Sequence, residues 1–235
     1  MQISIIIPVL NEEENLRRLL PYLRQEAATD RIAEVLVVDG GSTDASRDTA
    51  RALGARVLCT GCGRALQMNA GAHSAKGELL YFLHADSIPP RGFDRQILQA
   101  QEGGPAAGCF RLRFEGGNRI LRFFAWFSRF NCLLCRGGDQ SLFVPAAWFR
   151  ELQGFDTSYR IYEDNEFISR LYGRYPFRIL KAPIYTSDRK YRKIGTLKLQ
   201  YYFGVIHLKR FLGAGPESLY EYYNRKIGGR LQRSS

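Results

Sequence analysis

Short hydrophobic runs alternate with segments of helical periodicity along the first third of the chain. The runs at 3–10, 33–39, 55–60 and 78–86 are rich in Ile, Val and Leu and have the length of strands. Continuous runs of this kind are typical of strands buried on both faces of a parallel sheet. The segments between them place leucines or alanines three and four residues apart, which predicts helices. Repeated strand–helix alternation predicts an α/β fold with a mostly parallel central sheet flanked by helices.

The alternation weakens in the second half of the chain. A basic and strongly aromatic stretch covers 118–136, and a helix is predicted to begin at Glu163. A last strand followed by a basic loop is predicted over 177–193. Two basic terminal helices are predicted over 194–215 and 216–229.

The net charge of +11 is unevenly distributed. Residues 188–235 hold eleven Lys or Arg and three Asp or Glu, whereas 111–136 hold six Arg and one Glu. A solvated basic face explains such clusters, but they also suit an anionic partner such as phosphates, nucleic acid or lipid headgroups. No nucleic-acid-binding motif accompanies them, so a nucleic-acid partner is not expected.

The sequence predicts a cytoplasmic location. No apolar run approaches the roughly 20 residues of a spanning helix, and the start of the chain, MQISIIIPVLNEEEN, does not resemble a signal peptide. The five cysteines include two C-x-x-C pairs separated by 69 residues. Free thiols are expected because the number is odd, and a zinc site stays open as an alternative.

Carboxylates stand where ligands bind in doubly wound sheets, at the carboxyl ends of strands. Asp39 follows the second strand and could accept an N–H group of a nucleobase, or simply cap the next helix. Asp86 follows the fourth strand and could hold Mg²⁺ or Mn²⁺, which prefer oxygen ligands. Glu163 and Asp164 begin a helix and could supply a general base.

The order of the motifs resembles the inverting nucleotide-sugar glycosyltransferases of the GT-A fold, in their large second family. The resemblance covers residues 1–175 and rests on SIIIPVLNEEENL, VVDGGSTDAS, GRALQMNAGAHSAKGELLYFLHAD, GGDQSLFVPAAWFRELQGFD and YEDNEF. The DGGSTD, FLHAD, GDQ and ED motifs are similar to those of a small bacterial subgroup. The resemblance implies a GT-A domain over 1–190 and a helical extension over 191–235, within one structural domain.

The resemblance implies a catalytic base, Asp164, with Glu163 as its partner, and a metal ligand, Asp86, for Mn²⁺ or Mg²⁺. His84 stands where the family usually has the first aspartate of a D-x-D motif, which implies a contact with the ribose. Gly40 stands where the family often has a second aspartate. The other implied contacts are with the nucleobase and ribose (Pro8, Glu12 and Asp39), the nucleotide phosphates (Arg64), and the meeting point of the donor and acceptor sugars (Asp139 and Gln140).

The implied activity is the transfer of one sugar, with inversion, from a nucleotide sugar such as a UDP-sugar to a hydroxyl acceptor. The Q-x-x-R-W motif of processive synthases is absent. The basic and aromatic segments predict contact with an anionic membrane surface, at which a lipid-linked acceptor would be presented. Two alternatives are a nucleotidyltransferase and a non-catalytic nucleotide- or nucleic-acid-binding module. The acidic, glycine-free loop after the first strand disfavours the nucleotidyltransferase.

Overall fold

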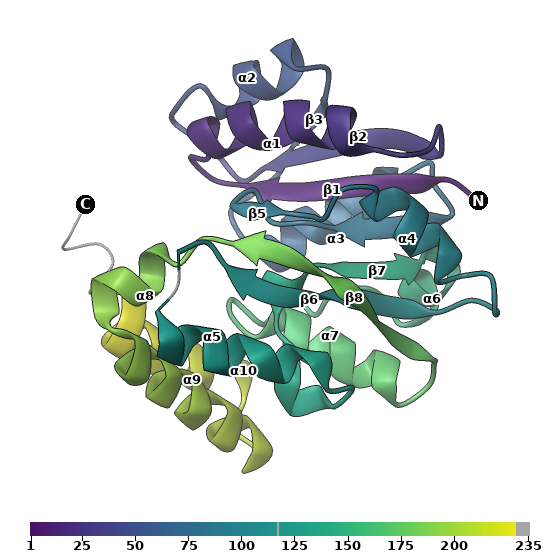
Figure 1. Ribbon diagram of the computed structural model, residues 1–235. Helices are drawn as coiled ribbons and strands as arrows, with labels where there is room; N and C mark the ends of the chain where they lie inside the picture. The colour runs from purple at the N-terminus through teal and green to yellow at the C-terminus, as the bar shows by residue number, and fades with distance from the viewer. Residues whose placement is uncertain (117, 229–235) are drawn as a thin grey trace.

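A single mixed sheet organises the computed structural model, which describes residues 1–116 and 118–228. Within these ranges the strand order is β3-β2-β1-β4-β7-β6-β8-β5 (Figure 1). The strands are β1 (Ile3–Val9), β2 (Ile32–Asp39), β3 (Arg56–Cys59), β4 (Leu79–Phe82), β5 (Ser87–Ile88), β6 (Ala107–Phe114), β7 (Leu142–Pro145) and β8 (Phe177–Thr186).

The first half of the sheet is parallel, as the strand–helix alternation predicts. β3, β2, β1 and β4 are parallel neighbours. β7 is antiparallel to β4 and to β6, β6 and β8 are parallel to each other, and β5 is antiparallel to β8. The predicted α/β class with a mostly parallel sheet flanked by helices is therefore confirmed.

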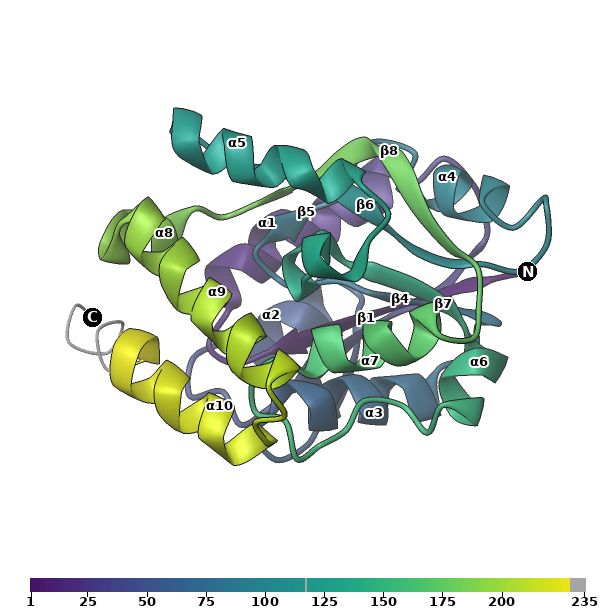
Figure 2. The ribbon, with the colours of Figure 1, turned by 90° about the horizontal axis from the view of Figure 1, so that it is seen from below.

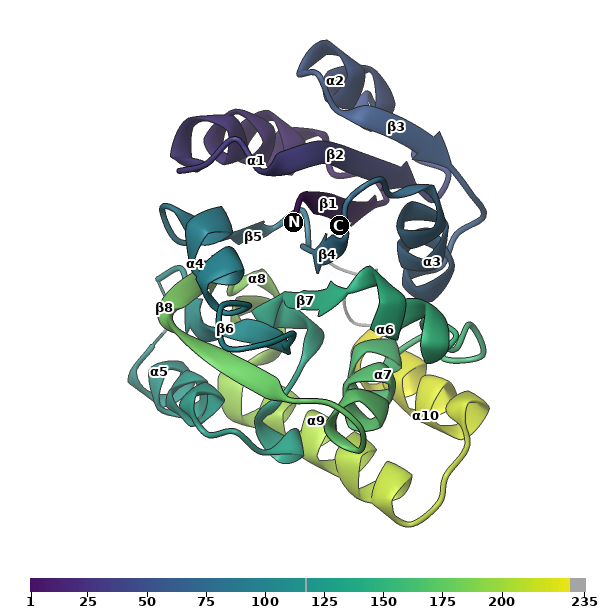
Figure 3. The ribbon, with the colours of Figure 1, turned by 90° about the vertical axis from the view of Figure 1, so that its right-hand side faces the viewer.

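Helices cover both faces of the sheet (Figure 3). One face packs against α1, α2 and α4, and the other face packs against α3, α6 and α7. Because successive strand residues point to opposite faces, Ile5 and Ile7 belong to the first core and Ile6 to the second. The helices are α1 (Glu13–Glu26), α2 (Ser46–Ala52), α3 (Arg64–Ser74), α4 (Phe93–Gln99), α5 (Arg119–Trp126), α6 (Ala146–Glu151), α7 (Glu163–Tyr172), α8 (Arg189–Ile194), α9 (Thr196–Phe211) and α10 (Pro216–Tyr223).

A third apolar cluster joins the C-terminal helices to α5 and to the segment before α7. It contains Leu121 of α5, Tyr159, Leu199 and Ile206 of α9, and Leu219 of α10. The helices α8, α9 and α10 lie toward the side of the molecule to which β1 runs from the N-terminus (Figures 1 and 2). The C-terminal helices therefore stand at the same end as the carboxyl ends of the parallel strands.

The C-terminal region differs in one respect from the sequence prediction. Residues 189–194 form the short helix α8 where a basic loop is predicted. The two predicted terminal helices are present as α9 and α10, and α10 continues as a π-helical turn over Asn224–Gly228. The predicted end of the last helix, at 229, and the rest of the extension to 235 lie outside the described residues.

Candidate active site

The carboxyl ends of β1, β2 and β4 meet at one edge of the sheet, because these strands are parallel neighbours. Val9 pairs with Asp39 at the ends of β1 and β2. The segment that contains His84 and Asp86 follows β4 and leads into β5. The sheet therefore brings three of the predicted motifs to one place.

Asp39 is 1% exposed, and its carboxylate is held by its own turn. Its oxygens accept hydrogen bonds from the backbone N–H groups of Gly41, at 3.0 Å, and Ser42, at 3.1 and 3.2 Å. Arg47 Nε lies 3.9 Å from Oδ2. Pro8 is buried within β1 opposite Val38. Both residues thus have structural roles, and their predicted contacts with a nucleobase stay predictions.

Gln67 is a residue of this edge that the sequence analysis missed. Its side-chain amide Nε2 donates to the carbonyl oxygens of Val9, at 2.8 Å, and Val38, at 2.7 Å, and so ties the ends of β1 and β2 together. A Cβ atom on Gly40 would lie 2.9 Å from Gln67 Cδ. The Gln67 amide therefore explains why glycine, rather than a second aspartate, stands at position 40.

Glu12 and Asp86 lie near each other and near two cations of α8. Burial raises the pKa of Glu12, and the charge of Asp86 raises it further, whereas Arg189 and Lys190 lower it. Burial also raises the pKa of Asp86, with Asp139 adding to the effect and Lys190 and Arg189 opposing it. The sequence showed only a net positive charge here, while the fold brings these two cations to the predicted phosphate and metal site.

An ion pair connects the starts of α3 and α7. Arg64, the first residue of α3, has its Nε 2.8 Å from Oε1 of Glu163, the first residue of α7. Glu163 is 1% exposed, whereas the Arg64 side chain keeps 40% of its surface accessible. Glu163 and Asp164 also lie at the helix N-terminus, where the dipole favours carboxylates. Both effects offset only part of the cost of burying two adjacent acids.

Asp164 has the electrostatic properties of a general base. Burial raises its pKa to about 7, and the charges of Glu163 and Asp139 contribute, while Arg64 opposes the shift. Oδ2 of Asp164 lies 3.9 Å from His84 Nε2. Burial, together with the charge of Arg64, lowers the pKa of His84 to about 4, so its imidazole is neutral at pH 7. Perturbed pKa values of this kind cluster at functional sites.

The loop before β7 supplies Asp139 and Gln140. The charge of Asp139 raises the pKa values of four other candidate residues: Arg64, His84, Asp86 and Asp164. Its carboxylate therefore lies among them. Gln140 is buried and is occupied within the loop, because its Oε1 accepts from Arg136 Nη1, at 2.5 Å, and its Nε2 donates to the Cys135 carbonyl, at 2.6 Å. Its predicted contact with a sugar stays a prediction.

Arg136, which the sequence analysis did not single out, holds this loop together. Its guanidinium is buried and donates to the backbone carbonyls of Ser128 and Phe130 as well as to Gln140. Its own carbonyl accepts a hydrogen bond from Asn165 of α7, at 3.1 Å. The loop is therefore fixed against the helix that carries Asp164.

A cavity of about 630 Å³ adjoins this cluster. Arg64, Asp139, Asp164 and Lys190 form its charged wall. The rest is mainly apolar and is lined by β6, α5, the 127–137 segment and the C-terminal helices, with Phe114, Phe124, Phe127, Leu134, Phe203 and Ile206. Its volume lies within the range of about 300–1,000 Å³ that is usual for small-molecule sites. The cavity could hold a polar donor sugar beside an apolar acceptor.

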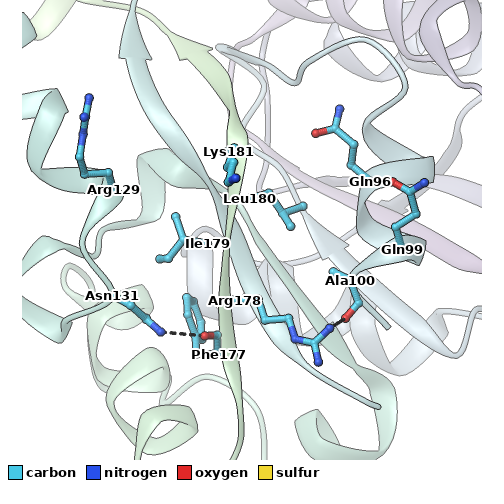
Figure 4. Close-up of a pocket in the computed structure, with 10 residues that line it drawn as sticks. All are labelled: Gln96, Gln99, Ala100, Arg129, Asn131, Phe177, Arg178, Ile179, Leu180 and Lys181. Atoms are coloured by element: carbon cyan, nitrogen blue, oxygen red, sulfur yellow. Dashed lines mark hydrogen bonds between the residues drawn. The ribbon is translucent and has the colours of Figure 1, made fainter. Parts of the chain in front are cut away.

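A second cavity, of about 620 Å³, lies over β8 and α4 (Figure 4). Arg178 donates there to the Ala100 carbonyl, and Asn131 donates to the Phe177 carbonyl. Its lining residues include cations and amides but no carboxylate. It therefore lacks the acid–base groups that the first cavity has.

The residues around Asp86 fit a divalent cation that also binds a diphosphate. Within the described ranges no group of three or more His, Cys, Asp or Glu side chains is placed to hold a metal. Burial, together with the charge of Asp139, raises the pKa of Asp86, and a bound cation would oppose both effects. Mg²⁺ and Mn²⁺ commonly take one or two protein carboxylates and complete their shell with substrate phosphates and water.

In the described part of the chain, the cysteines do not form the zinc site that the two C-x-x-C pairs left open as an alternative. Cys132 Sγ lies 3.1 Å from Cys135 Sγ, and all five cysteines are free thiols. Cys59 and Cys62 are exposed. No third ligand accompanies either pair within the described residues.

Residues 4–152 match the family model for glycosyl transferase family 2. The chain therefore belongs to this family and is a glycosyltransferase, as the motif resemblance implied. Membership in the family favours a glycosyltransferase over the two alternatives, a nucleotidyltransferase and a non-catalytic binding module.

The chain is similar to enzymes named undecaprenyl-phosphate 4-deoxy-4-formamido-L-arabinose transferase. The one from Edwardsiella ictaluri is 29% identical over 222 residues, which cover 84% of this chain and 64% of that protein. The one from Aeromonas hydrophila is 36% identical over 121 residues, which cover 46% of this chain and 36% of that protein. The chain thus spans less than two thirds of the length of these relatives.

Solved structures share the fold. TarS 1-349 of S. aureus in complex with UDP has a TM-score of 0.66 and 20% identity, covering 80% of this chain and 60% of that one. Glucosyl-3-phosphoglycerate synthase from Mycobacterium tuberculosis, in complex with Mn²⁺, UDP and glucosyl-3-phosphoglycerate, has a TM-score of 0.63 and 18% identity, covering 91% of this chain and 81% of that one. At this identity the likeness establishes the GT-A fold alone.

Proposed function

We propose that this glycosyltransferase moves one sugar from a UDP-sugar to an O–H group of a lipid-linked acceptor, with inversion at the anomeric carbon. The proposal rests mainly on Asp164. This residue lies in the wall of a partly apolar cavity, and burial raises its pKa to about 7. A general base is most effective when its pKa lies near the working pH. The motifs assign the enzyme, on this proposal, to a small bacterial subgroup of the family.

Asp164 takes the proton of the acceptor O–H group as its oxygen attacks the anomeric carbon. The new C–O bond forms on the face opposite the nucleotide, and the bond from the anomeric carbon to the diphosphate oxygen breaks with its electron pair on UDP. A single displacement of this kind inverts the anomeric configuration. Arg64 holds Glu163 at 2.8 Å and keeps the start of α7 fixed while Asp164 changes its protonation state.

Asp86 would bind a Mn²⁺ or Mg²⁺ ion together with the donor diphosphate. A bound divalent cation supplies charge neutralisation for the leaving diphosphate. Arg189 and Lys190 act electrostatically on Asp86 and Glu12, so they are close enough to add positive charge to the same place. Supporting this assignment, a structural neighbour is complexed with Mn²⁺ and UDP.

The nucleotide would lie along the ends of β1 and β2, beside Glu12 and Asp39. Asp39 already accepts two backbone N–H groups, but a carboxylate has about four acceptor positions and can accept a further N–H from a nucleobase. The preference for uridine is supported by the neighbours that bind UDP. His84, neutral at pH 7 and next to Asp164, is proposed to reach the ribose or the sugar.

Two observations support a lipid-linked acceptor. The similar curated enzymes are named for undecaprenyl phosphate. The helices α5 and α9, whose side chains line the cavity, also carry exposed apolar side chains with Arg or Lys among them. They include Phe123 (59%), Trp126 (43%) and Phe130 (44%) in and after α5, and Leu208 (55%), Phe211 (87%) and Leu212 (73%) in and after α9.

These apolar side chains support a proposed contact with the cytoplasmic surface of the membrane. Basic-aromatic amphipathic helices lie in the lipid interface, and each Lys or Arg near an anionic surface contributes about 1 kcal/mol. The terminal helices are only partly available, because Tyr202 is buried while Tyr201 is exposed. None of the helices in the described ranges is both long and apolar enough to cross a membrane.

Turnover of nucleotide sugars tests the proposed function. Purified protein is incubated with a panel of UDP-, GDP- and dTDP-sugars, with Mn²⁺ or EDTA, with and without polyprenyl phosphate in vesicles. The proposal expects Mn²⁺-dependent consumption of a UDP-sugar that increases when the lipid is present. If no nucleotide sugar is consumed under any of these conditions, the proposed function is wrong.

A further inference from the structure

The segment that leads into α7 has an unfavourable backbone conformation. Tyr162, directly before Glu163 and Asp164, has φ +71° and ψ +4°, which is the left-handed region. A residue with a large side chain rarely adopts this conformation, because its Cβ crowds the backbone. Such a residue persists only where its surroundings hold it, and such positions cluster at active sites.

Contacts from α9 and α10 hold this segment. The Tyr162 hydroxyl and His207 Nδ1 of α9 are joined by a hydrogen bond of 2.9 Å, and the two rings meet edge to face. The guanidinium of Arg210 lies 5.9 Å from the centre of the Tyr159 ring. The guanidinium of Arg160 lies 4.8 Å from the centre of the Tyr220 ring of α10.

The hydrogen bond between Tyr162 and His207 joins two neutral groups. Burial raises the pKa of Tyr162 and lowers the pKa of His207, so neither side chain is charged near pH 7. Both side chains line the cavity that Asp164 enters. Helix α9 therefore reaches the Asp164 side of the cavity through an uncharged contact. This contact adds no net charge near Asp164, Glu163 or Arg64.

We propose that Tyr162 and His207 are positioning residues, through which the C-terminal helices set the direction in which Asp164 enters the cavity. The inference rests on the proposed function of Asp164 as the base. The ψ angle of Tyr162 determines where the next two residues begin α7. A change there would alter the 2.8 Å contact between Arg64 and Glu163 and the 3.9 Å contact between His84 and Asp164.

The test uses substitutions that keep the rings and remove only the hydrogen bond. Tyr162→Phe removes the hydroxyl, and His207→Phe removes the ring nitrogen that it bonds while filling the space. His207→Gln returns a group that can bond the hydroxyl. Tyr201→Phe is the matched control, since Tyr201 lies on the same helix with 66% of its surface exposed. Thermal melting establishes that each variant is folded before the kinetics are measured.

In the sugar-transfer assay, Tyr162→Phe and His207→Phe should each lower kcat by about 10- to 100-fold, the range expected from a displaced catalytic group. The KM for the nucleotide sugar and the affinity for UDP should not change. The double variant should be no slower than the slower single variant, because both remove the same interaction. His207→Gln should recover part of the rate. A normal kcat for Tyr162→Phe, or independent and multiplying losses in the double variant, would overturn the inference.

Hydrogen exchange separates this inference from the proposed function. The first-turn amides of α7 should exchange at least several-fold faster in Tyr162→Phe and His207→Phe than in wild type, and no faster in Tyr201→Phe. If wild type transfers no sugar from any donor, the proposed function fails, and the exchange result still decides whether α9 holds the start of α7. Equal exchange in wild type and both variants would overturn the link itself.

Discussion

The raised pKa of Asp164 predicts that its ionisation lowers the free energy of unfolding. Burial and two neighbouring acids raise the pKa from 3.8 to about 7. A carboxyl group that holds its proton more tightly in the folded state makes the free energy of unfolding fall as pH rises from about 4 to about 7. The shift of about three pKa units corresponds to about 4 kcal/mol, at 1.36 kcal/mol for each unit. Asp164→Asn cannot ionise, so it should be more stable than wild type at pH 8 by up to this amount.

Urea unfolding at pH 5 and pH 8 measures the effect. The stability difference between Asp164→Asn and wild type should grow from pH 5 to pH 8. Over this range the buried carboxyl group ionises in wild type and lowers its stability, whereas the amide of the variant does not ionise. Asp30→Asn is the control, since the Asp30 side chain is 94% exposed. It should show no such difference. If Asp164→Asn and wild type lose stability in parallel between the two pH values, the pKa of Asp164 is not raised and its assignment as the base loses its physical support.

Three further predictions concern the cation, the strand ends and the membrane. In wild type with Mn²⁺ present, UDP at a hundred times its dissociation constant should add about 2.7 kcal/mol of stability, measured by thermal shift. Asp86→Ala should abolish the dependence of this UDP binding on Mn²⁺. Gly40→Ala should destabilise the fold by about 1–3 kcal/mol in urea, since the new methyl group would lie 2.9 Å from Gln67 Cδ; an unchanged midpoint would contradict the close packing. Phe211→Ser should reduce co-sedimentation with anionic vesicles, because Phe211 is 87% exposed; equal and negligible pelleting of wild type with anionic and neutral vesicles would remove the membrane proposal.

The parallel half of the fold could be predicted because its inner strands β1 and β4 are buried on both faces. A run such as 3–9 must then be almost wholly apolar, and the helices between such runs must carry one apolar side. The antiparallel half could not be predicted in the same way. The four-residue strand β7 pairs with both β4 and β6, but its short apolar run contains nothing that fixes its direction or its neighbours.

The candidate site shows a similar division. Acids that follow strands, such as Asp86, are visible in the sequence because they interrupt apolar runs. Gln67 was missed because an amide within a helix usually faces solvent, whereas here it bonds two strand ends. The cations of α8 and the partner of Tyr162 were missed because they are distant in sequence, and only the packing of the C-terminal helices brings them to the cavity.

The rate of sugar transfer by wild type and by Asp164→Asn, measured with the same UDP-sugar, Mn²⁺ and acceptor vesicles, tests the proposed mechanism most directly. Wild type should transfer the sugar with kcat/KM rising as pH increases through about 7, the pKa of the base. Asp164→Asn should bind UDP with unchanged affinity and transfer the sugar about 10²–10⁴ times more slowly. Transfer by Asp164→Asn at the wild-type rate would contradict the assignment of Asp164 as the catalytic base.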